Sequence, residues 1–174
     1  AQTNTATSYM IDEDNGVTNG GDWYVITGGR QDYMNWWQKC REITIEVSTN
    51  KAVGTESLNT FWNSNYKSLL QLLEQSLYGF RGVVTDAQTG NPLVAKVFVN
   101  SHDADSSFVY SSLPIGNYHR PIKAGTYSVT YSAPCYQSQT HTITVQDFQT
   151  VRLDVALQQG ANANFYAPET SNCT

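Results

Sequence analysis

Six short runs of alternating apolar and polar residues fill the second half of this 174-residue chain. They are FRGVVTD, AKVFVNS, SSFVYSS, GTYSVTYSA, THTITVQD and TVRLDVAL, and they lie between Phe80 and Leu157. The segments between them contain TGNP, LPIGN, KAG and APCY, whose Gly, Pro and Asn residues favour turns. Short strands at such intervals are typical of two packed antiparallel sheets. The sequence therefore predicts an all-β sandwich over residues 80–158, followed by a polar tail or linker over 159–174.

The first half of the chain has a helical period instead. From Thr55 onward, large apolar residues recur at steps of three and four, and Thr55 or Ser57 can cap the start. The apolar positions are Leu58, Phe61, Trp62, Tyr66, Leu69, Leu70, Leu73 and Leu77. We expect this amphipathic helix to end at Gly79. Residues 1–22 are rich in Thr, Asn, Gly and Asp without apolar periodicity, so they are expected to form a loop.

A strand is predicted before the helix, over Arg41–Ser48. The order REITIEVS alternates, with Ile43, Ile45 and Val47 on one face and Glu42, Thr44 and Glu46 on the other. Burial of the helix stripe requires a sheet beneath it, and one strand cannot cover it. We therefore expect another polypeptide, or another copy of this chain, to cover the helix. Residues 1–79 are thus predicted to form an α/β fragment made of loop, strand and helix.

Composition narrows the class of partner. The chain carries 15 acidic residues against 10 Lys and Arg, and charged residues make up only 14% of it. Nucleic-acid-binding proteins usually present a clustered basic face, and no basic run occurs here, so no nucleic acid partner is expected. No apolar run approaches the roughly 18 residues of a membrane span and no leader opens the chain, so no membrane association is expected. The abundance of Ser, Thr, Asn and Gln favours an exported protein, either secreted or periplasmic.

Cysteine and histidine spacing argues against a metal site within this chain. The cysteines are Cys40, Cys135 and Cys173, and the histidines are His102, His119 and His141. Three widely spaced cysteines form no CxxC pair and cannot all pair within the chain, so one thiol stays free or pairs elsewhere. The histidines show none of the HxxH, HxxxH or HxxE spacings that ligate zinc. We expect the histidines to be surface residues and expect this chain to bind no metal.

The segment from Gly16 to Thr49 contains the motifs TNGGDWY, GGRQD and KCREITIE. In this order and spacing they resemble the closing part of the active site in the carboxypeptidase N/E branch of the zinc metallocarboxypeptidases. The later frame, GVVTDAQTGNPL followed by AGTYSV and APCY, resembles the transthyretin-like domain that follows the catalytic domain in this branch. The resemblance implies the C-terminal part of a catalytic domain over residues 1–79 and a transthyretin-like sandwich over 80–158.

The resemblance also implies roles for individual residues. Glu46 matches the strand glutamate that takes a proton from the attacking water and later passes it to the leaving amine. Tyr24 matches the mobile tyrosine that hydrogen-bonds the C-terminal end of the bound peptide, a task that suits a phenol neutral at pH 7. Gln31 matches the floor of the specificity pocket, where this branch accepts C-terminal Lys or Arg, and Thr44 matches a residue that lines it. The alternatives are that Glu46 faces solvent, that Tyr24 packs beside Trp23, and that Thr44 is purely structural.

Other positions in the two motifs carry conformational expectations. Gly28 and Gly29 would allow the tight backbone path that returns Tyr24 to the pocket, because only Gly enters positive φ without cost. Cys135 stands where the family usually has Gly, so it would strain the APCY turn or take part in a bond. The tryptophans could form a carbohydrate platform, but their clustering in the catalytic motif and the closing helix favours a core role. They are Trp23, Trp36, Trp37 and Trp62.

Two functions are therefore weighed. The first is the C-terminal portion of a secreted zinc carboxypeptidase that cleaves C-terminal residues, preferentially basic ones, from peptides. The resemblance implies zinc in the complete enzyme, held by an HxxE pair and a distant His upstream of the matched region, so this chain alone is expected to be inactive. Its partners would be peptide C-termini and the missing upstream segment or other copies of the chain. The second function is a non-catalytic secreted assembly or adhesion module built on the sandwich.

Overall fold

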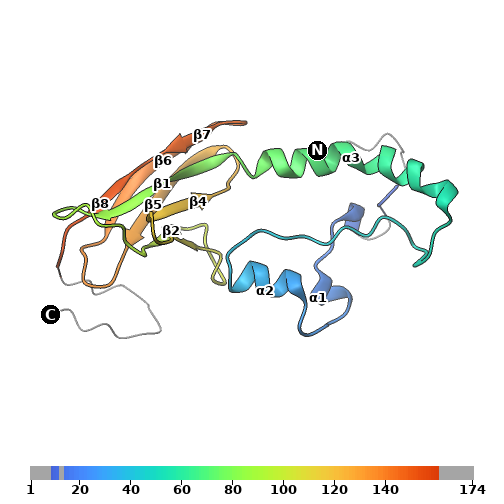
Figure 1. Ribbon diagram of the computed structural model, residues 1–174, viewed down its shortest axis with the longest axis horizontal. Coiled ribbons are helices and arrows are strands. Elements are labelled where there is room, and N and C mark those ends of the chain that lie inside the picture. Colours follow the sequence, from blue (N-terminus) through green and yellow to red (C-terminus); the bar gives the residue numbers. More distant parts are fainter. Residues whose placement is uncertain (1–8, 12–13, 161–174) are drawn as a thin grey trace. The chain divides into compact units, whose positions relative to one another are not determined.

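The computed structural model describes residues 9–11 and 14–160, and the expected tail lies mostly outside these residues. The chain divides into two compact units, residues 1–74 (unit 1) and residues 75–174 (unit 2). Figure 1 labels most of their helices and strands along the chain. In the part that the structure describes, no helix is both long and apolar enough to cross a lipid bilayer.

Unit 1 is built from short helices and one long one. They are η1 (Asp14–Gly16), α1 (Gly20–Trp23), α2 (Arg30–Trp36), η2 (Thr55–Ser57) and α3 (Leu58–Gln75). Part of the expected N-terminal loop is therefore helical, because the Asn19 side chain accepts a hydrogen bond from Gly21 N and caps α1. The long helix is confirmed, but it ends at Gln75 and not at Gly79. Gly79 has a φ of +117° and opens the first strand of unit 2.

The strand predicted over residues 41–48 is wrong. This segment has no regular secondary structure, and Ile43, expected on a buried face, is 56% exposed. A strand exists through hydrogen bonds to a neighbouring strand, and none of the described residues of unit 1 forms one. The alternation that predicts a strand is present in the sequence, but there is no sheet in this unit for it to join.

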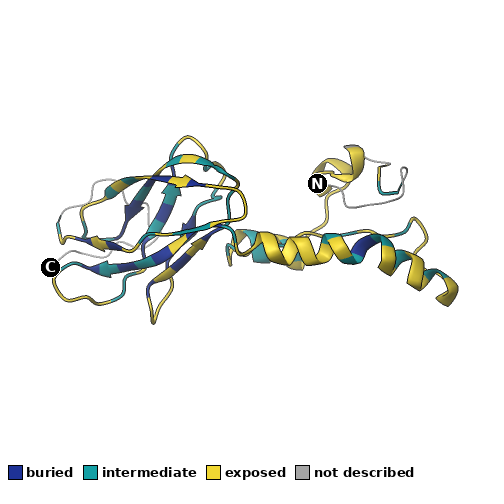
Figure 2. Ribbon diagram, turned by 90° about the horizontal axis from the view of Figure 1, so that it is seen from above, coloured by how far each residue is buried: buried dark blue, intermediate teal, exposed yellow. Residues whose placement is uncertain are grey.

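The apolar stripe of α3 is exposed, as the missing cover predicts. Figure 2 shows α3 largely in the colour of exposed residues, and Asn65 is its only buried residue. Asn65 Nδ2 donates to the Phe61 carbonyl and to the Tyr9 hydroxyl, each at 2.8 Å. That hydroxyl in turn donates to the Val47 carbonyl at 2.8 Å. Polar bonds, and not a core, therefore tie α3 to the segment that precedes it.

Unit 2 is the predicted all-β sandwich. Its strands are β1 (Gly79–Asp86), β2 (Lys96–Val99), β3 (Val109–Tyr110), β4 (Asn117–Arg120), β5 (Gly125–Ser132), β6 (Gln139–Val145), β7 (Thr150–Arg152) and β8 (Val155–Leu157). One sheet has the order β4-β1-β7, with β8 also pairing with β1, and the other has the order β3-β2-β5-β6. The inward positions of these strands form one apolar core: Phe80, Val84, Ala95, Val97, Val99, Val109, Tyr118, Val129, Tyr131, Ala133, Ile143, Val145, Val155 and Leu157.

Two strands of the sandwich differ from the sequence pattern. β4 was not predicted, because its inward positions are Tyr118 and a fully buried Arg120. The run TVRLDVAL, expected as one strand, is divided into β7 and β8. At the division the Asp154 carboxylate accepts a hydrogen bond from Val83 N at 3.0 Å, in place of a backbone carbonyl. Gly82 lies opposite, where a Cβ would come within 1.8 Å of the Leu153 carbonyl oxygen, so the close approach requires glycine.

Several buried polar groups of the sandwich have hydrogen-bond partners. The Arg120 guanidinium donates to the Asp103 carboxylate and, at 2.9 Å, to the Ser107 carbonyl. The hydroxyls of Tyr118 and Tyr131 lie 2.9 Å apart, and Tyr118 also donates to the Leu153 carbonyl at 2.6 Å. These contacts fix β4 and the adjoining loops against the core, because an unpaired buried polar group would be destabilising.

Candidate functional site

Gln31 and Thr44, the two predicted pocket residues, lie together in unit 1. Gln31 is in the first turn of α2, and Thr44 lies in the irregular segment that follows that helix. Thr44 Oγ1 donates a hydrogen bond to Gln31 Oε1 at 2.5 Å. The structure thus places side by side two residues that are thirteen positions apart in the chain.

Asn35 holds the same two segments together through the backbone. Its Nδ2 donates to the Glu42 carbonyl at 2.7 Å and to the Gln31 carbonyl at 3.0 Å, and its Oδ1 accepts from Glu42 N at 3.3 Å. Arg30 Nη2 adds an ion pair to Glu42 at 3.4 Å, but Arg30 is 80% exposed, so this pair contributes little. Sequence reasoning missed Asn35. Its position four residues after Gln31, on the same face of a helix, is the signal that could have identified it.

Tyr24 and Glu46, the predicted catalytic residues, are on the surface. Tyr24 is 55% exposed, and its ring contacts the Trp23 ring edge-on at 4.8 Å between centroids. Glu46 is exposed. Among the described residues neither side chain has a hydrogen bond or ion pair, so nothing joins them to the Gln31–Thr44 pair. Their proposed roles remain predictions.

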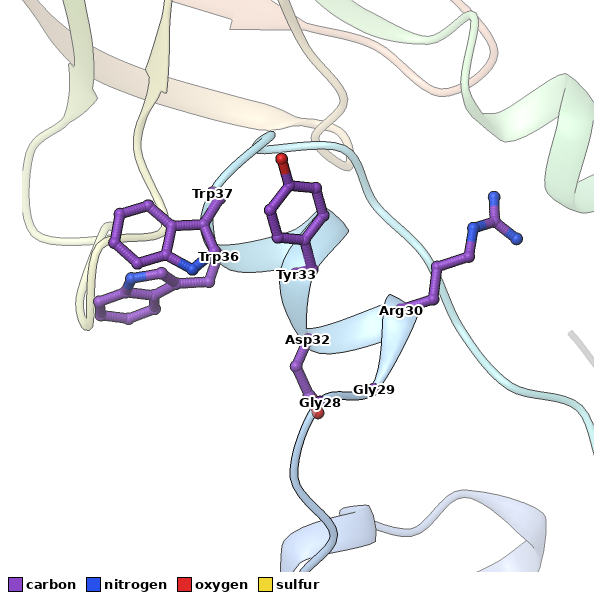
Figure 3. Close-up of a pocket in the computed structure, with 7 residues that line it drawn as sticks. All are labelled: Gly28, Gly29, Arg30, Asp32, Tyr33, Trp36 and Trp37. Carbon is purple, nitrogen blue, oxygen red and sulfur yellow. The ribbon is translucent and has the colours of Figure 1, made fainter.

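An open hollow of about 620 Å³ lies beside α2 and contains none of these four residues. It is lined by Gly28, Gly29, Arg30, Asp32, Tyr33, Trp36 and Trp37. In Figure 3 the two indole rings lie at one end of α2, while the Arg30 side chain points away from them. Trp37 is 70% exposed, so the hollow is an uncovered surface that does not exclude water.

The sequence predicts a glycine-dependent backbone at both Gly28 and Gly29, just before α2, and the structure shows it at Gly28 only. Gly28 has a φ of +76°, the region that favours glycine. Gly29 has an ordinary extended conformation, with a φ of −68°, and is the N-cap of α2. A Cβ at Gly29 would lie 2.9 Å from an Asp32 carboxylate oxygen, so this glycine leaves room for Asp32 in the first turn. An acidic group there interacts favourably with the helix dipole.

The described residues contain no group of three or more His, Cys, Asp or Glu that could hold a metal ion. His102 and His119 are exposed, and His141 is half-buried. His102 Nδ1 lies 3.2 Å from the Asp103 carboxylate, which already binds Arg120. Partial burial of its ring, and then the nearby Arg81, lower the pKa of His119. These contacts describe residues of the sandwich surface and not a metal centre.

The strongest acidic perturbation lies in unit 2, at Asp86. The pKa of Asp86 is held well below its usual range, chiefly by the Thr89 backbone N–H and the Tyr136 hydroxyl. These donors lie 2.8 Å and 2.7 Å from the carboxylate, and Gln88 N donates at 2.7 Å. The two backbone bonds close the turn after β1, and the Tyr136 bond joins this turn to the segment before β6, so the perturbation has a structural cause.

The structure gives the bonding state of two of the three cysteines. Cys135 is disulfide-bonded, whereas Cys40 is free and exposed. Cys135 also has a φ of +65°, which favours the glycine usual in the resembled turn. Both expectations for this residue, strain and a bond, are met. Cys173 lies outside the described residues.

Comparison with known protein families identifies a family that the sandwich of unit 2 matches. Residues 79–158 match the carboxypeptidase regulatory-like domain. The fold and the family match therefore define unit 2 as a domain of this class.

Relatives extend the similarity into unit 1. The chain is 36% identical over 149 residues to the carboxypeptidase N catalytic chain of Mus musculus. This alignment covers 84% of this chain and 31% of that protein. It is 33% identical over 148 residues to carboxypeptidase D of Rattus norvegicus, covering 82% and 10% respectively. It is 34% identical over 147 residues to carboxypeptidase M of Mus musculus, covering 82% and 33%. The chain thus spans about a third or less of the length of these curated relatives.

An aligned stretch of 149 residues is longer than unit 2, residues 75–174, so it includes part of unit 1. The resemblance to the metallocarboxypeptidases is confirmed, and it concerns their C-terminal region. Among solved structures, a protein of unknown function from Bacteroides fragilis aligns over 48% of this chain and 28% of its own at 27% identity. Its TM-score of 0.34 is too low to define the fold.

Proposed function

We propose that this chain is the C-terminal portion of a secreted zinc carboxypeptidase that removes C-terminal basic residues from peptides. The observation that carries the proposal is the contact between Gln31 and Thr44, in a chain whose relatives are carboxypeptidases. Residues 1–79 would complete the catalytic domain, residues 80–158 would be the regulatory-like domain, and residues 159–174 would be a tail or linker.

The Gln31–Thr44 pair can accept hydrogen bonds from a cationic side chain. Thr44 occupies one lone pair of Gln31 Oε1, and an amide oxygen has a second one. The Thr44 hydroxyl oxygen also has acceptor capacity. Ammonium and guanidinium groups only donate, so these two oxygens suit a C-terminal Lys or Arg. The net charge of −5 also favours a basic peptide.

Glu46 and Tyr24 would carry the chemistry. Glu46, a carboxylate, would take a proton from the attacking water and return it to the leaving amine. The Tyr24 phenol would donate to the C-terminal end of the peptide. Both are exposed in this chain, which is compatible with a surface that other residues of the enzyme cover.

Zinc does not fit the described residues of this chain, because they contain no metal-ligating group of three. A zinc ion would therefore depend on ligands other than these residues. We expect the 174-residue chain by itself to release no C-terminal Arg from a peptide, with or without zinc. Zinc-dependent release of Arg by this chain alone would show that the proposal of inactivity is wrong.

The positive test uses the protein as isolated from its source. Its intact mass under denaturing conditions, compared with 19.4 kDa, shows whether further residues are present. In a longer protein we expect zinc-dependent release of C-terminal Arg, and we expect Glu46→Gln to lower kcat by about 10²- to 10⁴-fold. Glu56→Gln, in the turn before α3, is the matched control and should keep the parental rate. Equal rates for Glu46→Gln and the parent would exclude Glu46 as the proton acceptor.

Secretion has a separate support. Cys135 forms a disulfide, and disulfides persist in oxidising compartments such as the periplasm or the extracellular space. We propose a secreted or periplasmic location. Fractionation of cells with an antibody to the chain would test it, and recovery in the cytosol with a reduced Cys135 would contradict it.

The second candidate function is a non-catalytic assembly or adhesion module. The exposed apolar face of α3 favours it, since Leu70 is 60% and Leu73 is 67% exposed. Leu77, just after the helix, is 56% exposed. What covers Leu69, Leu73 and Leu77 distinguishes the two functions. Cross-linking from α3 to another polypeptide with an HxxE motif would favour the enzyme, whereas cross-links only between copies of this chain would favour assembly.

A further inference from the structure

Among the described residues, strand β6 is the outermost strand of its sheet, with no strand paired to its outer side. It ends the sheet β3-β2-β5-β6, and all seven of its residues are in register with β5 on its other side. Ser128 of β5 accepts from Asn100 N at 2.8 Å, so its backbone groups point toward β2 and away from Thr142, its partner on β6. The Ser128–Thr142 pair is therefore of the non-hydrogen-bonded kind.

The backbone groups of three threonines point out from this edge. Because pairs alternate in an antiparallel ladder, Thr140 and Thr144 share the orientation of Thr142, with N–H and C=O directed away from β5. Within residues 9–11 and 14–160, none of these backbone groups has a hydrogen-bond partner. They present a row of donors and acceptors at which a further strand can pair.

The other sheet edges are short or charged. β3 has only two residues, and β8 and β7 have three each, of which β7 includes Arg152. β4 has four residues and includes His119 and Arg120. Short length and charge are the usual means by which proteins prevent edge pairing. β6 has seven residues, with the sequence QTHTITV, and contains no Pro, Lys, Arg, Asp or Glu.

Burial fixes the side-chain orientation of β6. Ile143 and Val145 are buried in the core, and His141 lies on the same face, where its ring contacts Tyr131 edge-on at 5.8 Å. The three threonines lie on the opposite, exposed face. Two of them contact threonines of β5: Thr144 and Thr126 hydroxyls lie 3.0 Å apart, and Thr140 and Thr130 hydroxyls 2.9 Å apart. A register slip would expose the core residues, so the edge is held in one register.

We propose that β6 pairs antiparallel with β6 of a second copy of this chain, about a two-fold axis at Thr142. In this register Thr140 of each copy faces Thr144 of the other, and the open backbone groups meet in about six hydrogen bonds. The hydroxyl rows of the two copies then continue into each other, and no like charges oppose. A second copy is the occupant because the threonines are symmetric about Thr142, so the strand is complementary to itself, as a two-fold interface requires. The proposal depends on unit 2 alone and is independent of carboxypeptidase activity.

Sedimentation of the 174-residue chain across about 1–500 µM tests the pairing. We expect the mass to rise with concentration from 19.4 kDa toward twice that value. Thr142→Lys places two ammonium groups opposite each other on the axis, and it should keep the mass at 19.4 kDa throughout. The matched control is Thr126→Lys, on the same face but on β5, and it should associate like the parent. A parent chain that stays monomeric, or an association that survives Thr142→Lys, overturns the proposal.

Cross-linking tests the register directly. Residues that oppose each other in a hydrogen-bonded antiparallel pair have Cα atoms about 5.5 Å apart, a distance that a disulfide spans. In a Cys40→Ser background, Thr142→Cys should form a covalent dimer under mild oxidation. Thr126→Cys in the same background should stay monomeric. Absence of the Thr142→Cys dimer in a folded variant that still associates would also overturn the proposal, because the copies would then meet elsewhere.

Discussion

The two units of this chain contain apolar residues in similar proportions but bury them to very different extents. In unit 2 the apolar side chains face one another between two sheets, and Val84, Val97 and Val129 are fully buried. In unit 1 the apolar face of α3 is open, and Asn65 is the one buried residue of that helix. Figure 2 shows the contrast between the alternating strands and the exposed helix. The difference shows that apolar periodicity determines whether a segment favours a helix or a strand. A hydrophobic core also needs a second helix or sheet in the same molecule to pack against.

The largest expected difference between the units comes from deleting apolar side chains. Phe80→Ala should destabilise unit 2 by about 3–5 kcal/mol, because Phe80 is fully buried and its removal leaves a cavity. Leu73→Ala in α3 should change the free energy of unfolding by less than about 0.5 kcal/mol, since Leu73 is 67% exposed. Urea unfolding followed by circular dichroism measures both. A similar cost for the two variants would show that α3 is covered in solution.

The next largest difference between the units should come from removing a tyrosine hydroxyl. Tyr118→Phe removes the donor to the Leu153 carbonyl and the partner of the Tyr131 hydroxyl, which should cost about 1–3 kcal/mol. Tyr33→Phe in unit 1 is the control, because Tyr33 is 53% exposed and its loss should be nearly neutral.

Alkaline pH should destabilise unit 2 through Tyr118. Burial raises the pKa of Tyr118 to about 12 in the folded state, from about 10 in the unfolded chain. A raised folded pKa gives stability that is complete below pH 10 and is lost as the pH rises toward 12. We therefore expect the urea midpoint of the parent to fall over this range more than that of Tyr118→Phe. Parallel curves for the two proteins would contradict the buried, hydrogen-bonded hydroxyl.

Acid should act on unit 2 through Asp86. Its folded pKa is lowered, first by the Thr89 N–H and then by the Tyr136 hydroxyl, so its contribution is present above the unfolded pKa near 4 and is lost below it. Asp86→Asn should therefore be less stable than the parent at pH 7, and the gap should narrow as the pH falls below about 4. Asp147→Asn, a change at an exposed carboxylate in the same unit, is the matched control and should be about as stable as the parent at pH 7. A constant gap between Asp86→Asn and the parent would refute the assignment.

The smallest expected effect concerns local order in unit 1. Asn35→Ala removes the hydrogen bonds to Gln31 and Glu42, with a local cost of about 1 kcal/mol. Amide hydrogen exchange should show faster exchange at Glu42, whose N–H donates to Asn35, while the amides of α3 are unchanged. Asn63→Ala, on the exposed side of α3, should leave Glu42 unaffected. Unchanged exchange at Glu42 in Asn35→Ala would mean that other contacts hold the segment.

Particular residues show how far sequence reasoning reached. The helix stripe predicted α3, and the alternating runs predicted most strands of the sandwich. β4 was missed because Arg120 occupies an inward position, which the Asp103 carboxylate and the Ser107 carbonyl of another loop make tolerable. The strand over 41–48 was predicted from a correct alternation that has no sheet to join. In the candidate site, Gln31 and Thr44 were predicted and found together, but their link through Asn35 depends on how the chain turns after α2.

By itself the sequence determined the elements whose interactions are local: the i to i+4 hydrogen bonds of α3, the turns with Gly and Pro, and the inward and outward faces of each strand. The tertiary structure alone decided which strands found partners, where Asp154 divides β7 from β8, and why a buried Arg120 is stable. Within residues 9–11 and 14–160, it also left the outer edge of β6 without a paired strand and the apolar face of α3 exposed. The physical reason is that a helix satisfies its own backbone, whereas strands, buried charges and cores are completed only by residues distant in the chain.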